Sequence, residues 1–263
     1  MPSPEKILLF GKPGSGKTYQ IIKTAQWLAS SGAQFYVADS DDSYERSLGE
    51  FGGQASVPNL HITFVYDWKD YTKWADEVKA KIVPFRDWMV VDRADKAWRR
   101  VQEWFSEEVH GKSMAERTVE ARKAFAKKKA MVVTPNDQAD WMTINANYFE
   151  WFNSVMYESR ANIMFVCAVD KVRTEDSEET KTLYSAIGIN PAGQKEIAHE
   201  PHTVIFFEQD SAHQYHARTI KDRGGRTYFL PGPGDLLVAF PQQYLMMRAG
   251  WTERGPAWLN GTR

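Results

Sequence analysis

The stretch "KILLFGKPGSGKTYQ", Lys6 to Gln20, decides the fold class. It starts as a short apolar run and leads into a helical pattern, with glycines, a proline and lysines between the two. The eight residues from Gly11 to Thr18 match G-x-x-x-x-G-K-[ST] at every position. This motif is typical of a phosphate-binding loop when a strand precedes it and a helix follows. Because the motif and both flanks agree, we favour that loop over a plain glycine-rich turn.

The residue types in this loop fit phosphate chemistry. Glycines allow successive N–H groups to turn inward around phosphate oxygens, and the following helix points its N-terminus at the same anion. We expect Lys17 to reach the β- and γ-phosphates and Thr18 to hold Mg²⁺. Pro13 fixes φ and makes the loop stiffer. The residues expected to bind the nucleotide are Gly11, Pro13, Gly14, Ser15, Gly16, Lys17, Thr18 and Tyr19.

The composition is that of a soluble globular protein. The chain has 263 residues, 43% hydrophobic and 25% charged, and a net charge of −1, so any nucleic-acid-binding surface must be local. The one cysteine, Cys167, lies in an apolar run and reads as a buried residue. No disulfide can form within the chain, which suits a reducing cytoplasm. The sequence shows no membrane-spanning run, and we expect a cytoplasmic protein.

Short apolar runs alternate with longer helical patterns along the chain. We expect parallel strands at residues 5–10, 35–38, 62–66, 88–91 and 162–169. Residues 203–207, 215–220 and 226–230 predict shorter, antiparallel strands. The fold class is therefore α/β, with a mainly parallel central sheet, helices on both faces and added antiparallel strands near the C-terminus. We expect one domain over residues 1–239 and a packed or partner-binding tail over residues 240–263.

Acidic residues follow two of the predicted strands. Asp92 ends the apolar run "WMVVD", where a P-loop NTPase places a carboxylate that orients Mg²⁺; a helix N-cap is the alternative. The turn "YVADSDDS" offers Asp39, Asp41 and Asp42 near the expected γ-phosphate. We predict Asp41 or Asp42 as the hydrolytic base, against the alternative of solvated turn carboxylates.

The order of these motifs resembles the RecA-like ATPase core. Within it, the sequence is similar to small phage-type P-loop ATPases related to single-strand annealing proteins and recombinases. A phage origin would place the protein in the cytoplasm of a bacterial host cell. The resemblance covers residues 5–235 and implies ATP and Mg²⁺ as cofactors. "YVADSDDS" is similar to the strand and acidic turn that carry a catalytic glutamate in RecA and RadA proteins, although this chain has Asp there.

Two further matches imply roles for basic residues. "NIMFVCAVDKVR" resembles the strand end that carries a γ-phosphate sensor, which would be Lys171 here in place of the usual amide. "TIKDRGGR" resembles a motif whose basic residues reach the nucleotide of the adjacent subunit, which implies Lys221 and Arg223 as cations acting in trans. A surface Asp-Lys pair and a basic hairpin turn are the respective alternatives.

The resemblance also implies DNA-binding segments after two of the strands. The segment "ERTVEARKAFAKKKAMVVTPND" carries six basic residues against two glutamates: Arg117, Arg122, Lys123, Lys127, Lys128 and Lys129. Such a stripe can neutralise DNA phosphates, and a solvated helix face is the alternative. The segment 172–196 is expected to be a loop, in which Tyr184 would either stack on a base or pack.

The expected function is ATP binding and hydrolysis on single-stranded DNA, in phage-type recombination or annealing. ATP would lie at the subunit interfaces of a homo-oligomeric ring or filament, and other replication or recombination proteins are further possible partners. The alternatives are a P-loop motor or remodeller, such as a helicase loader or packaging-type ATPase, and a nucleotide-gated binding module with little turnover. A small-molecule kinase is a weaker option, because no arginine-rich lid is evident.

Overall fold

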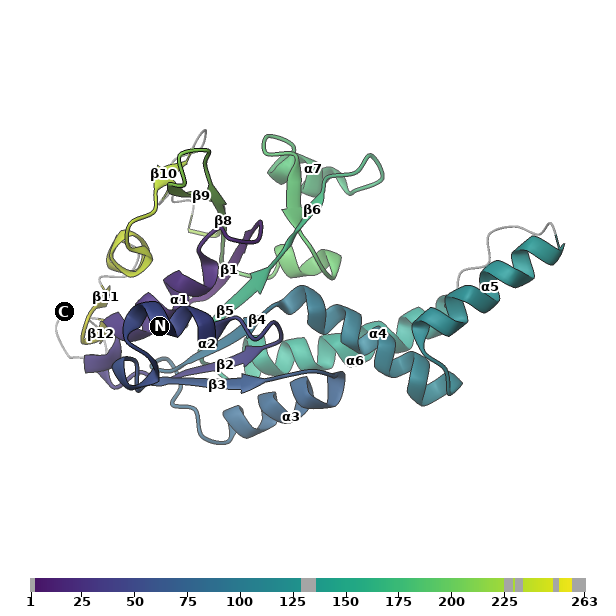
Figure 1. The fold of residues 1–263 in the computed structure, drawn as a ribbon, viewed down its shortest axis with the longest axis horizontal. Helices are drawn as coiled ribbons and strands as arrows, with labels where there is room; N and C mark the ends of the chain where they lie inside the picture. Colours follow the sequence, from purple (N-terminus) through teal and green to yellow (C-terminus); the bar gives the residue numbers. More distant parts are fainter. Residues whose placement is uncertain (1–2, 129–135, 225–228, 230–233, 248–250, 257–263) are drawn as a thin grey trace.

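A central eight-stranded sheet organises the residues that this computed structural model describes, which are 3–128, 136–224, 229, 234–247 and 251–256 (Figure 1). Its strands are β1 (Lys6–Gly11), β2 (Phe35–Asp39), β3 (Leu60–Phe64), β4 (Trp88–Asp92), β5 (Asn162–Cys167), β8 (Thr203–Gln209), β9 (Tyr215–Asp222) and β10 (Asp235–Leu236). The order is β10-β9-β8-β1-β5-β4-β2-β3, and the strands from β8 to β3 are parallel. β9 and β10 are antiparallel, so the predicted mainly parallel sheet with added antiparallel strands is confirmed. The prediction of an antiparallel strand at residues 203–207 is wrong in one respect, because β8 runs parallel to β1 and is antiparallel only to β9.

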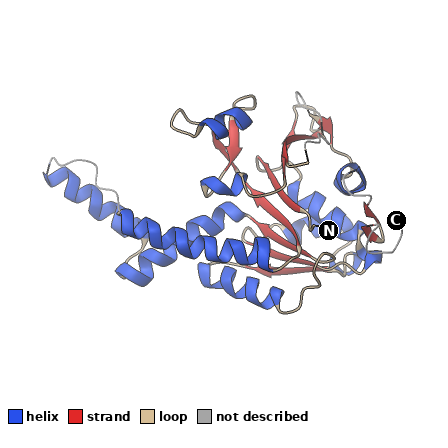
Figure 2. Cartoon of the chain, turned by 180° about the vertical axis from the view of Figure 1, so that it is seen from behind, coloured by secondary structure: helices blue, strands red, loops and turns tan. Residues whose placement is uncertain are grey.

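Helices cover both faces of the sheet, as predicted (Figures 1 and 2). They are α1 (Lys17–Trp27), α2 (Tyr44–Leu48), α3 (Trp68–Lys79), α4 (Ala94–His110), α5 (Met114–Lys128), α6 (Gln138–Asn153) and α7 (Glu178–Tyr184). The short helical turns are η1 (Ala29–Ser31), η2 (Gly49–Phe51), η3 (Gln54–Ser56), η4 (Ser154–Glu158), η5 (Lys195–Ala198) and η6 (Pro241–Met246). Two small antiparallel pairs are β6 (Val169–Lys171) with β7 (Ile189–Pro191) and β11 (Trp251–Thr252) with β12 (Gly255–Pro256).

Alternation along β1 divides the core into two layers. Leu8 and Phe10 point to the face covered by α3, α4 and α6, whereas Ile7 and Leu9 point to the face covered by α1, α2 and η6. All four side chains are fully buried because β1 lies between β5 and β8. This central place brings the carboxyl end of β1, and the loop that follows it, to the middle of the sheet edge.

The segment after β5 is structured, which corrects the expectation of a loop over 172–196. β6 and β7 pair, and α7 lies between them in the chain and forms a small lobe with them (Figure 1). Tyr184 ends α7 and is fully buried, with its ring edge-on to Phe10 at 5.8 Å. Tyr184 is therefore a packing residue that a DNA base cannot reach.

Helices α4, α5 and α6 form an arm on which α5 projects away from the sheet (Figure 2). At the base of this arm, Arg117 of α5 donates hydrogen bonds of 2.8 Å to Asn136 and 3.2 Å to Asp140. An aspartate capping box at Asp137 starts α6. The arm is thus fixed at its root by side chains that precede and begin α6.

The segment after β10 packs onto α1. Phe240, Tyr244 and Leu245 are fully buried in the same layer as Ile21. The backbone N–H of Phe240 donates a 2.9 Å hydrogen bond to Gln20 of α1. The strand expected at residues 226–230 lies outside the described residues except for Phe229, which is buried.

Candidate functional site

The loop between β1 and α1 has the shape that its glycines require. Gly14 and Gly16 adopt φ values of +79° and +85°, which side chains rarely adopt. A Cβ on Gly11 would lie 2.1 Å from the carbonyl oxygen of Phe207 and 2.6 Å from the hydroxyl of Ser15. The loop can therefore curl tightly over β8 and present its backbone toward the N-terminus of α1.

Lys17 begins α1 and folds back into this loop. Its ammonium donates hydrogen bonds to the carbonyls of Gly11 at 2.8 Å and Lys12 at 3.0 Å, and to the Ser15 hydroxyl at 3.1 Å. Burial lowers the pKa of Lys17 to about 8, while the nearby Asp92 carboxylate opposes that shift. An anion in the loop would favour the charged form of Lys17.

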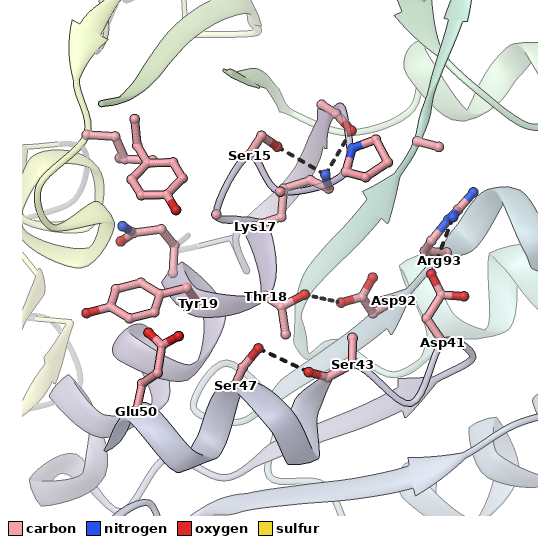
Figure 3. A pocket seen from close by; sticks show the side chains of 18 of the residues that line it. Ser15, Lys17, Thr18, Tyr19, Asp41, Ser43, Ser47, Glu50, Asp92 and Arg93 are labelled. Atoms are coloured by element: carbon pink, nitrogen blue, oxygen red, sulfur yellow. Dashed lines mark hydrogen bonds and ion pairs between the residues drawn. The ribbon is translucent and has the colours of Figure 1, made fainter. Parts of the chain in front are cut away.

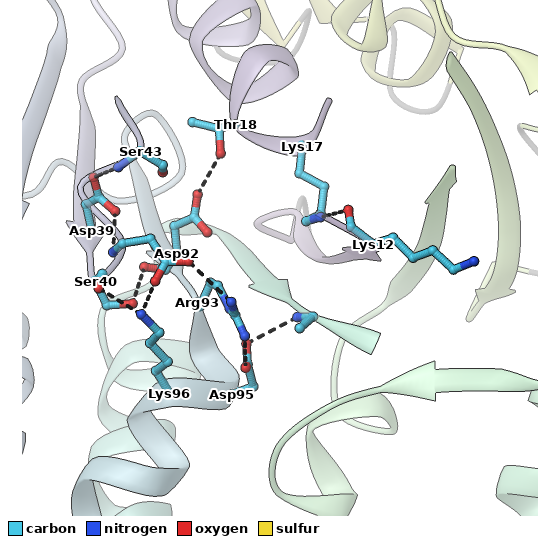
Figure 4. Close-up of polar contacts among 12 residues, drawn as sticks. Lys12, Lys17, Thr18, Asp39, Ser40, Ser43, Asp92, Arg93, Asp95 and Lys96 are labelled. Atoms are coloured by element: carbon cyan, nitrogen blue, oxygen red, sulfur yellow. Dashed lines mark hydrogen bonds and ion pairs between the residues drawn. The ribbon is translucent and has the colours of Figure 1, made fainter. Parts of the chain in front are cut away.

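Asp92, at the end of β4, lies beside the start of α1. The hydroxyl of Thr18 donates a 3.2 Å hydrogen bond to the Asp92 carboxylate, which is only 3% exposed (Figure 4). Burial and the neighbouring Asp39 raise the pKa of Asp92 to about 7, against the opposing effect of Lys17. The effects of burial and of the neighbouring carboxylate therefore outweigh the positive charge of Lys17.

A hydroxyl and a carboxylate side by side fit Mg²⁺, which binds proteins through one or two carboxylates together with substrate phosphates. Among the described residues, no group of three or more His, Cys, Asp or Glu side chains is placed to hold a metal ion. Thr18 and Asp92 would therefore hold Mg²⁺ jointly with the phosphates of a nucleotide.

Asp39, at the end of β2, shapes the acidic turn that follows it. Its carboxylate is buried and accepts backbone hydrogen bonds from Asp41 at 3.0 Å, Ser43 at 2.9 Å and Tyr44 at 3.3 Å. Asp42 has φ +53°, is exposed and lies outside the residues that line the cavity. Asp39 is therefore a structural residue that sets the path of the chain into α2.

The carboxylate of Asp41 lines the cavity but is engaged by two cations. It accepts a 3.3 Å hydrogen bond from Arg93 and forms an ion pair with Lys96. Arg93 also donates two hydrogen bonds, of 3.2 and 2.7 Å, to the carboxylate of Asp95. Sequence reasoning did not single out Arg93 or Lys96, although Arg93 directly follows Asp92 in "VVDRAD".

A cavity of about 630 Å³ joins these groups, a volume that suits a small-molecule ligand. The loop from Pro13 to Thr18 lies along it, and Asp41, Arg93 and Ala168 line one end. Tyr19 and Glu50 lie at the opposite end (Figure 3), and Tyr215, Leu237 and Val238 also line the cavity. The lining therefore includes the charged Asp41 and Arg93 on one side of the loop and a mainly aromatic and aliphatic group, with Glu50 among it, elsewhere.

The family model described as "AAA domain" matches residues 3–229, which contain the sheet from β1 to β9 and the phosphate-binding loop. The chain belongs to the AAA domain family. No curated protein matches this AAA domain chain in sequence.

Solved structures show the fold of this AAA domain. A RadB recombinase is similar at 13% identity, with 86% of this chain and 84% of that chain covered and a TM-score of 0.51. A KaiC-like protein from the archaeon Pyrococcus horikoshii OT3 is similar at 12% identity, with 90% of this chain and 84% of that chain covered and a TM-score of 0.45. The likeness to the RadB recombinase shows a RecA-like fold.

The other basic residues singled out in the sequence lie apart from the cavity of the AAA domain. Lys171 ends β6, is exposed and is not one of the residues lining the cavity. Lys221, near the end of β9, and Arg223, just beyond it, contact the carbonyl of His199. That end of β9 pairs with the start of β8, so both lie at the opposite end of the strands from the phosphate-binding loop.

The described part of the AAA domain has no helix that is both long and apolar enough to cross a membrane.

Proposed function

We propose that the chain is a Mg²⁺-dependent ATPase that acts on single-stranded DNA, of the kind used in phage-type recombination or annealing. The observation that carries the ATPase part is the contact between Thr18 and Asp92 beside Lys17, because it brings the parts of a nucleoside-triphosphate site to one place. The family and the fold agree with this chemistry.

The shape of the cavity supports one orientation for the nucleotide. Lys17 and the loop amides would hold the phosphates, while the base and ribose would lie against Tyr19, Tyr215 and Val238 at the other end. The triphosphate then points toward Arg93 and Asp41. Mg²⁺ bound beside Thr18 and Asp92 would supply positive charge at the β- and γ-phosphate oxygens.

The proposed DNA contact rests on the projecting arm. Arg122 and Lys123 of α5 are exposed, whereas Arg117 is bonded to Asn136 and Asp140, and Lys112 is paired with Glu120. The basic stripe is therefore smaller than its sequence suggests. The side chains of residues 127–129 lie outside the description. Two exposed cations on a projecting helix suit contact with DNA phosphates.

The position of Lys221 and Arg223 supports ATP at subunit interfaces. They lie far from the phosphate-binding loop of their own chain, so any contact they make with a nucleotide would be with that of a neighbouring subunit. Such a head-to-tail contact builds rings or filaments. Lys171 stays a proposed γ-phosphate sensor, and contact with the phosphate would require movement of the lobe that carries it.

A nucleotide-gated binding module with little turnover is the second candidate. The observation that favours it is the pairing of Asp41 with both Arg93 and Lys96. A carboxylate whose two oxygens are both engaged by cations is not free to contact an attacking water. Asp41 or the exposed Asp42 would act as base only after this pairing is released.

Steady-state ATP hydrolysis with and without single-stranded DNA tests the proposal. We expect DNA to stimulate turnover in the wild type, Lys17→Ala to abolish turnover, and Lys73→Ala, a surface change on α3, to leave it unchanged. Arg122→Ala with Lys123→Ala should weaken DNA binding and reduce its salt dependence. Indifference to DNA at low salt would overturn the DNA part. ATP binding without turnover would favour the second candidate.

A further inference from the structure

Arg93 is the cation at the charged end of the cavity. It directly follows Asp92, precedes the first residue of α4 and lines the cavity together with Asp41 and Ala168. Its side chain is 27% exposed, so part of it faces the cavity. The arrangement places a permanent positive charge on the far side of the Thr18–Asp92 pair from the aromatic end (Figure 3).

The hydrogen bonds of Arg93 differ in strength. Its Nε and Nη2 bond both oxygens of Asp95, at 3.2 and 2.7 Å, whereas Nη1 makes one 3.3 Å bond to Asp41. These bonds use three of the five N–H donors of a guanidinium, and the other two have no partner among the described residues. The bidentate pair is the stronger contact, and the single bond to Asp41 is the weaker one.

The partners of Arg93 are themselves held in place. Asp95 is buried and also accepts a 3.2 Å hydrogen bond from the backbone of Ala168, while Gly193 packs against its Cα. Asp41 keeps an ion pair with Lys96 whether or not Arg93 contacts it. Loss of the Arg93–Asp41 bond would therefore leave neither carboxylate without a cation.

We propose that Arg93 distinguishes a nucleoside triphosphate from a diphosphate by exchanging its single bond to Asp41 for the γ-phosphate while Asp95 keeps holding it. This inference rests on the proposed nucleotide site. In the orientation described above, the terminal phosphate points to the end of the cavity where the two unpaired donors lie. A guanidinium suits this contact because it bonds phosphate oxygens through several N–H groups in one plane.

Equilibrium binding by calorimetry tests the assignment, with a non-hydrolysable ATP analogue and with ADP, each with Mg²⁺. Arg93→Ala should weaken binding of the triphosphate about 10- to 100-fold and change ADP binding by less than about twofold, as expected for loss of charge-assisted hydrogen bonds. Asp41→Asn removes the carboxylate that competes with the γ-phosphate for Arg93, and it should raise the preference for triphosphate over ADP. Arg100→Ala is the matched control on α4, because Arg100 pairs with Glu103 instead.

Arg93→Lys controls for misfolding of the Arg93→Ala variant, because the lysine keeps a positive charge near the buried Asp95. It should fold like the wild type and lose most of the triphosphate preference, because one ammonium cannot bond Asp95 and phosphate in the same way. An unchanged preference in both Arg93 variants would overturn the inference, as would equal losses for the two nucleotides. If Lys17→Ala also binds both nucleotides like the wild type, the proposed nucleotide site fails as well; if Lys17→Ala loses them, only the role of Arg93 fails.

Discussion

The Thr18 hydroxyl donates a 3.2 Å hydrogen bond to the Asp92 carboxylate across 74 residues of sequence. This contact joins the start of α1 to the end of β4 and leaves the carboxyl group almost completely buried. The burial has a measurable consequence, because it raises the pKa of Asp92 from 3.8 to about 7.

The first prediction concerns stability and pH in the absence of nucleotide and Mg²⁺. Because the pKa of Asp92 is higher in the folded chain, the folded state binds an extra proton between about pH 4 and pH 7. The stability that comes from this proton is lost as pH rises through that window. Asp92→Asn removes the charge. We therefore expect its free energy of unfolding, relative to that of the wild type, to increase by about 2–4 kcal/mol from pH 5 to pH 8. Urea denaturation at both pH values checks this, and a constant difference between the two proteins would contradict it.

The second prediction compares two glycines of the phosphate-binding loop. Gly11→Ala should destabilise the fold by about 3 kcal/mol or more, because its Cβ would overlap the carbonyl of Phe207. Gly14→Ala adds only backbone strain in open space and should cost about 1–2 kcal/mol. Gly32→Ala has the same kind of strain outside the cavity and is the control for nucleotide binding. Chemical denaturation measures the free energy of unfolding of each variant. Equal losses of stability for Gly11→Ala and Gly14→Ala would contradict the predicted overlap with Phe207.

The third prediction tests the aromatic and aliphatic end of the cavity. Val238 is 61% exposed, so Val238→Ser should leave stability nearly unchanged. It should weaken ATP binding about three- to tenfold through lost apolar contact with the base. Binding of inorganic tripolyphosphate, which has no base, should not change. Val83→Ser, an exposed valine away from the cavity, is the control. Equal weakening of ATP and tripolyphosphate would place the base elsewhere.

The fourth prediction concerns the segment that follows β10. Phe240 is fully buried against the α1 layer, and Phe240→Ala should lower the free energy of unfolding of the whole chain by about 3–5 kcal/mol. Met246, in the short helix η6 that follows Phe240, is 48% exposed, and Met246→Ala should change the free energy of unfolding by less than about 0.5 kcal/mol. A single unfolding transition whose midpoint falls for Phe240→Ala and not for Met246→Ala would show that this segment is part of the core. A separate early transition would show an independent tail.

The sequence predicts best what depends on neighbours in the chain. The loop from Gly11 to Thr18 is contiguous, and its flanking strand and helix have strong apolar patterns, so its shape follows from local rules. Asp92 is also predictable, because the edge of a parallel sheet gathers the ends of its strands. Cys167 is buried, as its apolar run predicts.

Other parts of the site depend on pairings that local patterns do not reveal. Arg93 and Lys96 meet Asp41 from more than fifty residues away, and only the placement of β2 beside β4 brings them together. The sequence of the basic stripe does not indicate that Arg117 is hydrogen-bonded to Asn136 and Asp140. A sequence does not distinguish a charged side chain that is exposed to solvent from one that is paired. Which of the two applies depends on how the chain packs.

The central place of β1 has a consequence for synthesis of the protein. β1 is made first, yet its two partners, β5 and β8, begin at Asn162 and Thr203. The apolar run from Ile7 to Phe10 therefore lacks its neighbours in the sheet during synthesis until the chain has been translated as far as β8. During that interval it offers a short hydrophobic strand with two free edges, which is the kind of segment that chaperones bind and that aggregates when they do not.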